Sequence, residues 1–305
     1  MQGDGPEWCS HTLDPEQWER EHDEPCRIGG WDDANILKTV DGQRVWHCPH
    51  AAIEGHDECI FHLRPEDRPG DADPVAEFLA IINGERDALD GDGRRPPQFV
   101  EATFEDLDIE RERFGADETI DLRHARIGRM VWVVERVDAS IDASGATIEG
   151  SCECMSGRTT FDEVNFRNAT FDGRAFFLNS VLKESVFTSA VFNDGATFRT
   201  DLSEMVFPVS VFQGPADFSG ATARAGIDFR ITDGDRIVSE DLPTFTDEAD
   251  FTDASMADCD LGGRPSRTRT SKGQPSATPT LVMSIWKTQI SKRQTSGTPS
   301  SPRRS

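Results

Sequence analysis

The residues best suited to chemistry lie in the first 68 residues, which hold four of the chain's seven cysteines. The core of this signal is the pattern C-x21-C-x10-C-x2-H, formed by Cys26, Cys48, Cys59 and His62. Thiolate sulfur and imidazole nitrogen are the ligands of a closed tetrahedral zinc site. Because so short a segment has little apolar material for a core, bound metal would supply folding free energy. We therefore predict a structural Zn²⁺ held by these four residues.

Other residues in the same segment are alternative ligands, because C-x-H occurs twice, at Cys9/His11 and at Cys48/His50. Cys9, His11 or His50 would then replace one of the four. A metal-free small core is the competing interpretation, but the density of ligands favours zinc. The spacing also resembles short C-C-C-H zinc motifs of otherwise unrelated proteins. A catalytic zinc is disfavoured, because no open coordination position or general base stands out.

The sequence predicts one turn between the ligands and one helix after them. Asp41-Gly42 is typical of a tight turn between the first two ligands. After the linker RPEDRPGDADP, Asp73 as N-cap and Pro74 at the first position begin one short helix. Its apolar face consists of Val75, Phe78, Leu79 and Ile82. We predict a module over residues 1–68 and a linker with a capping helix over 69–98.

The stretch from residue 159 to 263 repeats in units of five, such as SVFTS, AVFND and ADFTD. A five-residue period fits neither an α-helix nor a flat strand, so the units must stack as coils about 4.8 Å apart. The third residue of each unit is large and apolar and the residue two before it is small. The large residues are Phe161, Phe166, Phe171, Leu182, Phe187, Phe192, Phe251, Met256 and Leu261, and the small ones are Ala169, Ser180, Ser185, Ala190, Ala249, Ala254 and Cys259.

This pattern resembles the pentapeptide-repeat family, whose consensus is A-(D/N)-L-x-x with Phe often replacing Leu. The resemblance implies an all-β fold, a right-handed quadrilateral β-helix, which we assign to residues 99–262. Degenerate units such as Ala102/Phe104 and Ala125/Ile127, followed by Ala139/Ile141 and Ala146/Ile148, extend the repeat toward the N-terminus. Pentapeptide solenoids often pair end to end, so the resemblance also implies a homodimer through the solenoid end.

Several departures from the repeat have structural interpretations. Steps of six residues, from Phe192 to Phe198 and from Phe212 to Phe218, place an extra residue at a corner, and ITDGDRIVSEDLP indicates an inserted loop. The segment MVWVV indicates one longer buried strand. CECM, with Cys152 and Cys154, is interpreted as part of an imperfect coil rather than a metal pair.

The composition is acidic, with 56 Asp and Glu against 32 Lys and Arg and a net charge of −24. An Asp-rich, Lys-poor chain is typical of proteins from salt-loving microbes, where salt screens self-repulsion. No apolar run approaches the roughly 20 residues needed to span a bilayer, and the N-terminus lacks the pattern of a signal peptide. The odd number of cysteines favours a reducing compartment. We therefore expect a cytoplasmic, haloarchaeal-type protein.

The last 43 residues, 263–305, reverse this character, because they contain nine basic residues and no acidic one. They are typical of a disordered basic tail. Reverse translation in a shifted frame, however, yields pentapeptide units in phase with CDLGG at the end of the repeat. We therefore interpret residues 263–305 as a frameshift product, without direct nucleic-acid binding.

No phosphate-binding glycine loop, nucleophile elbow or paired His/carboxylate set is present in the sequence. An enzyme is thus the least favoured class. We predict a non-catalytic scaffold or protein-interaction protein. The family resemblance implies two alternatives. One is a DNA mimic that binds DNA gyrase, and the other is the soluble regulatory part of a membrane or channel protein truncated by the frameshift.

Overall fold

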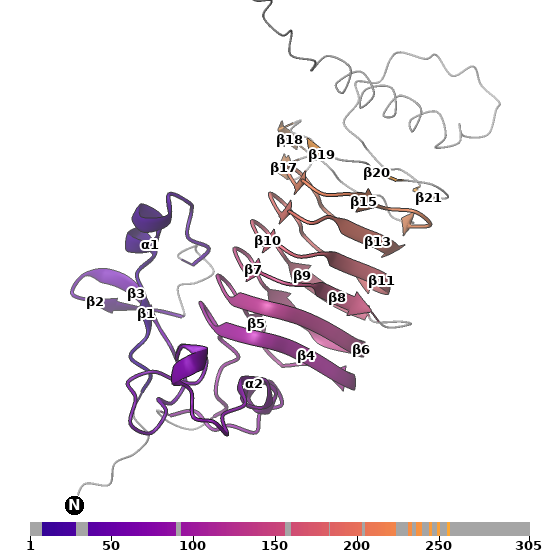
Figure 1. Cartoon of the computed structure of the whole chain (residues 1–305). Helices are drawn as coiled ribbons and strands as arrows, with labels where there is room; N and C mark the ends of the chain where they lie inside the picture. Colours follow the sequence, from indigo (N-terminus) through magenta and orange to yellow (C-terminus); the bar gives the residue numbers. More distant parts are fainter. Residues whose placement is uncertain are drawn as a thin grey trace, which may run out of the picture.

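The main body is a 16-stranded parallel sheet wound into a β-solenoid (Figure 1). The computed structural model describes residues 8–28, 36–89, 93–155, 160–182, 184–202 and 205–223, and then 231–233, 236–239, 244–245, 249–250 and 255–256. The solenoid strands are β4 (Thr103–Phe114), β5 (Ile120–Asp121), β6 (Arg126–Asp142), β7 (Thr147–Ile148), β8 (Cys152–Met155), β9 (Thr160–Asn165), β10 (Thr170–Phe171), β11 (Ala175–Leu182), β12 (Val191–Phe192), β13 (Ala196–Asp201), β14 (Val211–Phe212), β15 (Ala216–Asp217), β16 (Thr222–Ala223), β19 (Thr244–Phe245), β20 (Ala249–Asp250) and β21 (Ser255–Met256).

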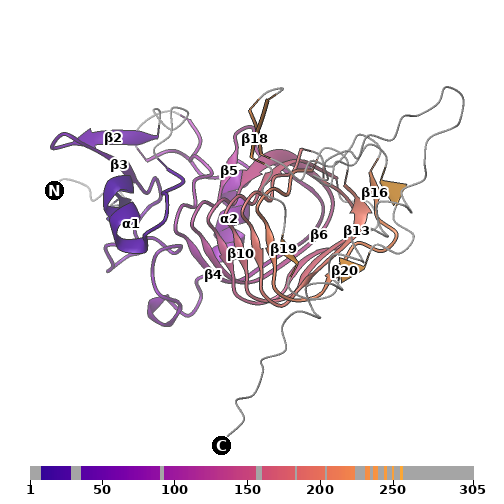
Figure 2. The same ribbon diagram turned by 90° about the horizontal axis from the view of Figure 1, so that it is seen from above.

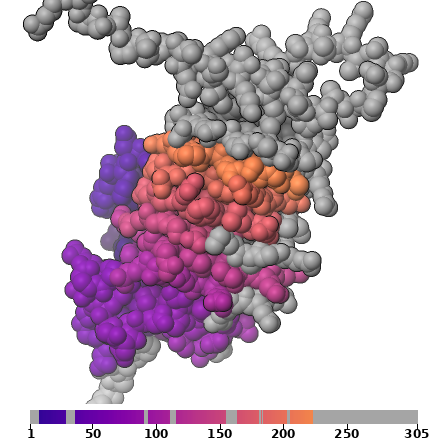
Figure 3. Space-filling view, turned by 45° about the vertical axis from the view of Figure 1, so that its right-hand side comes forward, coloured from indigo at the N-terminus to yellow at the C-terminus, as the bar shows by residue number. Residues whose placement is uncertain are grey.

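The register of the strands gives the length of one coil. Along one side of the solenoid the paired residues are Phe104, Ile127, Ile148, Phe171, Phe192 and Phe212, which follow one another at steps of 20 to 23 residues. Four five-residue units therefore make one coil, with up to three extra residues at its corners. The coils lie in chain order along the solenoid (Figure 3). The predicted all-β solenoid is confirmed.

Aromatic ladders fill the interior. Phe171, Phe192 and Phe212 stack nearly parallel, with centroids 4.7 Å apart at each step. Phe177 and Phe198 begin a second such ladder at 4.9 Å. Ala169 and Ala190, two residues before their aromatic partners, are also completely buried. In the units whose side chains the structure describes, the large and the small residue both point inward, as the repeat predicted.

The corners are β-turns that place a residue in the left-handed region. The amide of Ala169 bonds to the carbonyl of Phe166, and Ser210 bonds to Phe207 in the same way. The third residue of each turn has positive φ, namely Asn168 at 58° and Val209 at 60°. Asparagine tolerates this region, whereas a β-branched valine is strained there.

The irregular segments fit the solenoid in register. Cys152 pairs with Met130 and Ala175, and Cys154 pairs with Trp132 and Phe177, so both cysteines occupy interior positions of a coil. The MVWVV segment lies within β6, where buried and outward residues alternate and Val133 is 38% exposed. The expected insertion holds an antiparallel hairpin of β17 (Ile231–Asp233) and β18 (Arg236–Ser239).

The N-terminal module lies on one side of the solenoid (Figure 2), at the level of its first coils (Figure 1). It contains an antiparallel sheet in the order β1 (Thr12–Leu13), β3 (Gln43–His47), β2 (Leu37–Val40). Asp41 and Gly42 form the predicted turn, both with positive φ. The module also contains helix α1 (Pro15–His22), an additional helix that the sequence analysis did not predict. Asp14 caps α1 and Pro15 occupies its first turn, which is the same signal that identified the second helix.

Helix α2 (Pro74–Ile82) covers the end of the solenoid (Figure 1). Asp73 caps it through the amides of Val75 and Ala76, and the short 3-10 helix Pro65–Asp67 precedes it. Phe78 is completely buried, with its ring 4.6 Å from that of Phe99 in the first coil. The helix predicted from Asp73 and Pro74 is therefore present, and it packs against the first coil.

The suspected frameshift segment, 263–305, lies outside the described residues, as do Phe251 and Cys259 of the last units. Within the described part of the chain, no helix combines the length and the apolar character needed to cross a membrane.

Candidate metal centre

Cys9, Cys48, Cys59 and His62 converge on one point of the N-terminal module. Their ligand atoms all lie within 4.8 Å of one another, and all three cysteines are buried. The Sγ atoms of Cys48 and Cys59 are 3.7 Å apart, too far for a disulfide. The Sγ of Cys9 lies 3.6 Å from Nδ1 of His62, and that of Cys59 lies 3.2 Å from it.

These separations fit a tetrahedral zinc site. With Zn–S near 2.3 Å and Zn–N near 2.0–2.1 Å, tetrahedral ligands are about 3.8 Å apart for two sulfurs and about 3.6 Å apart for sulfur and nitrogen. The Cys48–Cys59 and Cys9–His62 separations match these values, and the Cys59–His62 separation of 3.2 Å is shorter. Three thiolates and one imidazole are also a typical donor set of structural zinc.

Backbone pairing brings distant segments to this point. The amide of Cys9 donates to the carbonyl of His50, and the amide of Cys48 donates to the carbonyl of His11. The two C-x-H segments therefore lie side by side. Cys59 and His62 share one tight turn, because the amide of His62 donates to the carbonyl of Cys59. The amide of Cys59 also donates to Sγ of Cys9, at 3.2 Å, which stabilises a thiolate there.

The tautomer of His62 suits a metal ligand. Its Nε2 lies 2.9 Å from the carbonyl oxygen of Val100, which can only accept, so Nε2 carries the proton. In the neutral ring the lone pair is then on Nδ1, the atom that faces the three sulfurs. Such a carbonyl partner fixes the tautomer and the ring orientation of metal-ligating histidines.

The pKa values of the three thiols are shifted in opposite directions. Hydrogen bonds from Cys48 and Cys59 hold the pKa of Cys9 far below its usual range. Burial raises the pKa of Cys48 and of Cys59. The three sulfurs thus favour one thiolate with two thiols donating to it, and a divalent cation is what would favour ionisation of all three.

Cys26, which the sequence analysis placed among the ligands, is not in this cluster, and Cys9 takes its place. The Sγ of Cys26 lies 3.8 Å from Nε2 of His124, a residue of the solenoid. The spacing did not reveal this, because the contact of Cys26 with the solenoid has no signal in the sequence around it. Burial raises the pKa of the Cys26 thiol to about 11.

The other two alternative ligands support the cluster from outside. His11 stacks on His62, with centroids 3.8 Å apart, and its Nε2 lies 2.9 Å from Oε2 of Glu101. His50 is buried and bonds through Nε2 to the carbonyl of Gln98 at 2.7 Å. The His11 contact joins the module to the first coil, and the His50 contact joins it to the residue directly before that coil.

Comparison of the chain with known proteins finds no matching family model, no matching curated protein and no matching solved structure.

Proposed function

We propose that this protein is a non-catalytic scaffold of the pentapeptide-repeat family, whose solenoid is held at its N-terminal end by a structural zinc module. The observation that carries this proposal is the convergence of Cys9, Cys48, Cys59 and His62 directly beside the first coil. The donor set, the sulfur and nitrogen separations and the tautomer of His62 all support a closed metal site.

A closed site supports a structural role rather than catalysis. Four protein ligands complete a tetrahedral zinc, which leaves no position for water or substrate. The solenoid adds broad, rigid outer faces suited to protein partners. We place its activity in the cytoplasm, where buried free thiols stay reduced.

Metal content of the full-length chain tests this proposal. We expect one zinc per chain in the wild type, measured by elemental analysis after exhaustive dialysis. Cys9→Ser should lose that zinc, because serine offers no thiolate. Cys26→Ser is the matched control, since it removes a thiol of the same module that lies outside the cluster, and it should retain zinc.

Two outcomes contradict the proposal. If wild-type protein refolded with zinc retains less than a stoichiometric amount, the proposed zinc site is rejected. If Cys26→Ser loses zinc and Cys9→Ser retains it, the result supports Cys26 rather than Cys9 as the fourth ligand.

A second candidate is a DNA mimic that binds DNA gyrase, and the net charge of −24 favours it. Part of this charge is balanced locally, because Arg129 pairs with Asp106 and Asp108 on the solenoid exterior. A supercoiling assay with gyrase at high salt separates the two candidates. Inhibition at micromolar protein supports the mimic, and full supercoiling activity discards it.

A further inference from the structure

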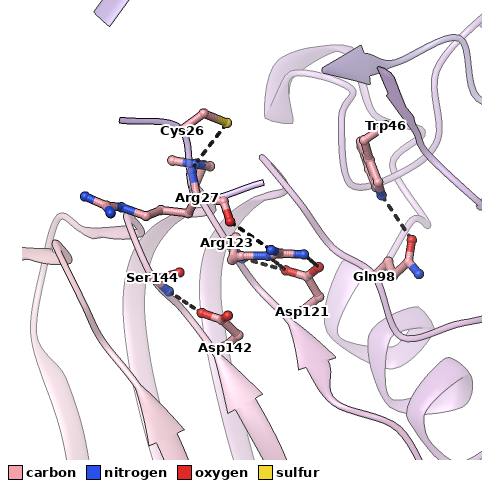
Figure 4. Close-up of polar contacts among 9 residues, drawn as sticks. Cys26, Arg27, Trp46, Gln98, Asp121, Arg123, Asp142 and Ser144 are labelled. Atoms are coloured by element: carbon pink, nitrogen blue, oxygen red, sulfur yellow. Dashed lines mark hydrogen bonds and ion pairs between the residues drawn. The ribbon is translucent and has the colours of Figure 1, made fainter. Parts of the chain in front are cut away.

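Arg27 is clamped to the solenoid by both polar atoms of its backbone. Its carbonyl accepts from Nη1 of Arg123 at 2.9 Å (Figure 4). Its amide donates to Nε2 of His124, also at 2.9 Å. Arg123 and His124 are neighbours in a corner turn of the solenoid, where His124 has a φ of 57°. The position of Arg27 is therefore fixed before any ligand binds.

Three successive coils present the same local turn beside this clamp. Asp121 and Asp142 are paired in the sheet, as are Asp142 and Asn165. Each accepts, through its side-chain oxygen, the amide of the residue two positions later, which is Arg123, Ser144 or Arg167. The outer coils thus carry an arginine at this position and the middle coil carries a serine.

The side chain of Arg27 occupies the space that the small residues of the middle coil leave. A Cβ placed on Gly145, the residue after Ser144, would lie 3.4 Å from Cγ of Arg27. It would also lie 2.7 Å from Nδ1 of His124, so only glycine fits here. Arg27 thus lies beside the middle coil, between the two coils that carry Arg123 and Arg167.

These three cations differ in what neutralises them. Arg123 is buried and forms a two-pronged ion pair with Asp121 (Figure 4). Within the described part of the chain, the guanidinium groups of Arg27 and Arg167 have no ion pair or hydrogen bond. Burial, followed by the positive charge of Arg167, lowers the pKa of Arg27, and the negative charges of Glu24 and Asp142 oppose this shift only in part. Two neighbouring cations that repel each other are stabilised by a bound anion.

Both arginines line one cavity of about 560 Å³, between the module and the solenoid. This volume is in the range of small-molecule pockets. Ser144 and Asn165 also line it and offer a hydroxyl and an amide NH₂ as donors. Asp142 and Glu118 lie there too and would accept from hydroxyl or amino groups of a ligand.

We propose that this cavity binds a small molecule whose phosphate or carboxylate group lies between Arg27 and Arg167. Its hydroxyl or amino groups bond to the acidic side chains of the same cavity. Because Arg27 belongs to the module and Arg167 to the solenoid, the ligand joins the two. The site is separate from the metal cluster and does not depend on the proposed zinc.

Inorganic phosphate is the probe for the oxyanion position. We expect saturable binding to the full-length chain by isothermal titration calorimetry, at constant ionic strength set with KCl. Arg167→Gln should raise the Kd about tenfold or more, because charge-assisted hydrogen bonds are lost. Arg27→Gln should do the same. Arg126→Gln is the control, since Arg126 is an exposed arginine that pairs with Glu149, and its Kd should be unchanged.

Arg167 is exposed, so its substitution should leave folding and zinc content unchanged, and both are measured on the same samples. Titration with acetate, compared with phosphate, then separates a carboxylate site from a phosphate site. Absence of saturable binding of both anions to the wild type overturns the proposal. An equal loss of affinity in Arg126→Gln and Arg167→Gln also overturns it, because the effect would then be general surface charge.

Discussion

Nε2 of His62 lies 2.9 Å from the carbonyl oxygen of Val100, and this hydrogen bond joins the candidate metal centre to the first coil of the solenoid. A second bond beside it runs from the amide of Thr103 to the carbonyl of Phe61, at 2.8 Å. A ligand of the cluster and its neighbour in sequence thus both contact the start of the solenoid. The metal cluster and the solenoid end are parts of one packed unit.

Metal removal should therefore loosen the first coil selectively. We expect a chelator to speed hydrogen exchange of the Thr103 amide, because its acceptor Phe61 lies next to a metal ligand. The Val191 amide, bonded to the carbonyl of Ala169 in the middle of the solenoid, is the internal control and should stay protected. Equal acceleration at both amides would show global unfolding instead, and no change at Thr103 would show that the metal does not hold the first coil.

Removal of the Phe78 side chain from the capping helix should destabilise the whole solenoid. Phe78→Ala removes a ring that contacts both Phe99 and Phe104, at centroid distances of 4.6 and 5.8 Å. We expect a loss of about 3–5 kcal/mol in the free energy of unfolding, measured by urea denaturation, and increased self-association by light scattering. Val75→Ala on the same helix, at a partly buried position, should cost much less. Equal effects of the two substitutions would argue against Phe78 as the capping contact.

A substitution at a corner should stabilise the protein. Val209 adopts a φ of 60° between Pro208 and Ser210, which strains a β-branched side chain. Asparagine tolerates this conformation, so we expect Val209→Asn to raise the free energy of unfolding by about 1 kcal/mol. Val211→Asn is the control, because Val211 lies in strand β14, and it should be destabilising. A lower melting temperature for Val209→Asn would contradict the strain argument.

Stability should fall as the solution becomes acidic. Burial lowers the pKa of His124 from 6.5 to about 4, and that of His50 to about 3. Below pH 6.5 the unfolded chain binds protons that the folded chain does not, so the free energy of unfolding decreases down to pH 4 and beyond. His124→Asn should make this decrease shallower, as measured by denaturation at several pH values. Because both proteins keep the same metal ligands, the difference between them reports on His124. An identical pH dependence of the free energy of unfolding in the two proteins would contradict the lowered pKa of His124.

The coding DNA should carry an inserted or deleted base near the codon for Gly263. The absence of acidic residues after this point and the in-phase repeats of the shifted frame motivate this expectation. Independent sequencing of both strands tests it. If sequencing confirms the reading frame of the present sequence, the frameshift hypothesis is rejected. A reopened frame would extend the repeats, and a membrane or channel domain beyond them would support a regulatory role for the solenoid.

The sequence by itself determined the solenoid, because its repeat has a short, fixed period. Each unit contributes the same large and small inward side chains, so the positions of Phe171 and Ala169 follow from their place in the unit. Local signals also sufficed for α2, since Asp73 and Pro74 act on the adjacent residues. The same signal at Asp14 and Pro15 was present for α1 and was missed.

Tertiary structure alone decided between Cys9 and Cys26 as a neighbour of Cys48 and Cys59. Ligand choice depends on how segments pack, and the pairing of the two C-x-H segments brings Cys9 into the cluster. Cys26 instead lies against His124, 98 residues further along the chain. The clamp on Arg27 was equally invisible in the sequence, because residues of two different parts form it. A repeat encodes contacts between equivalent positions, whereas a contact between a repeat and a non-repeating segment has no period to reveal it.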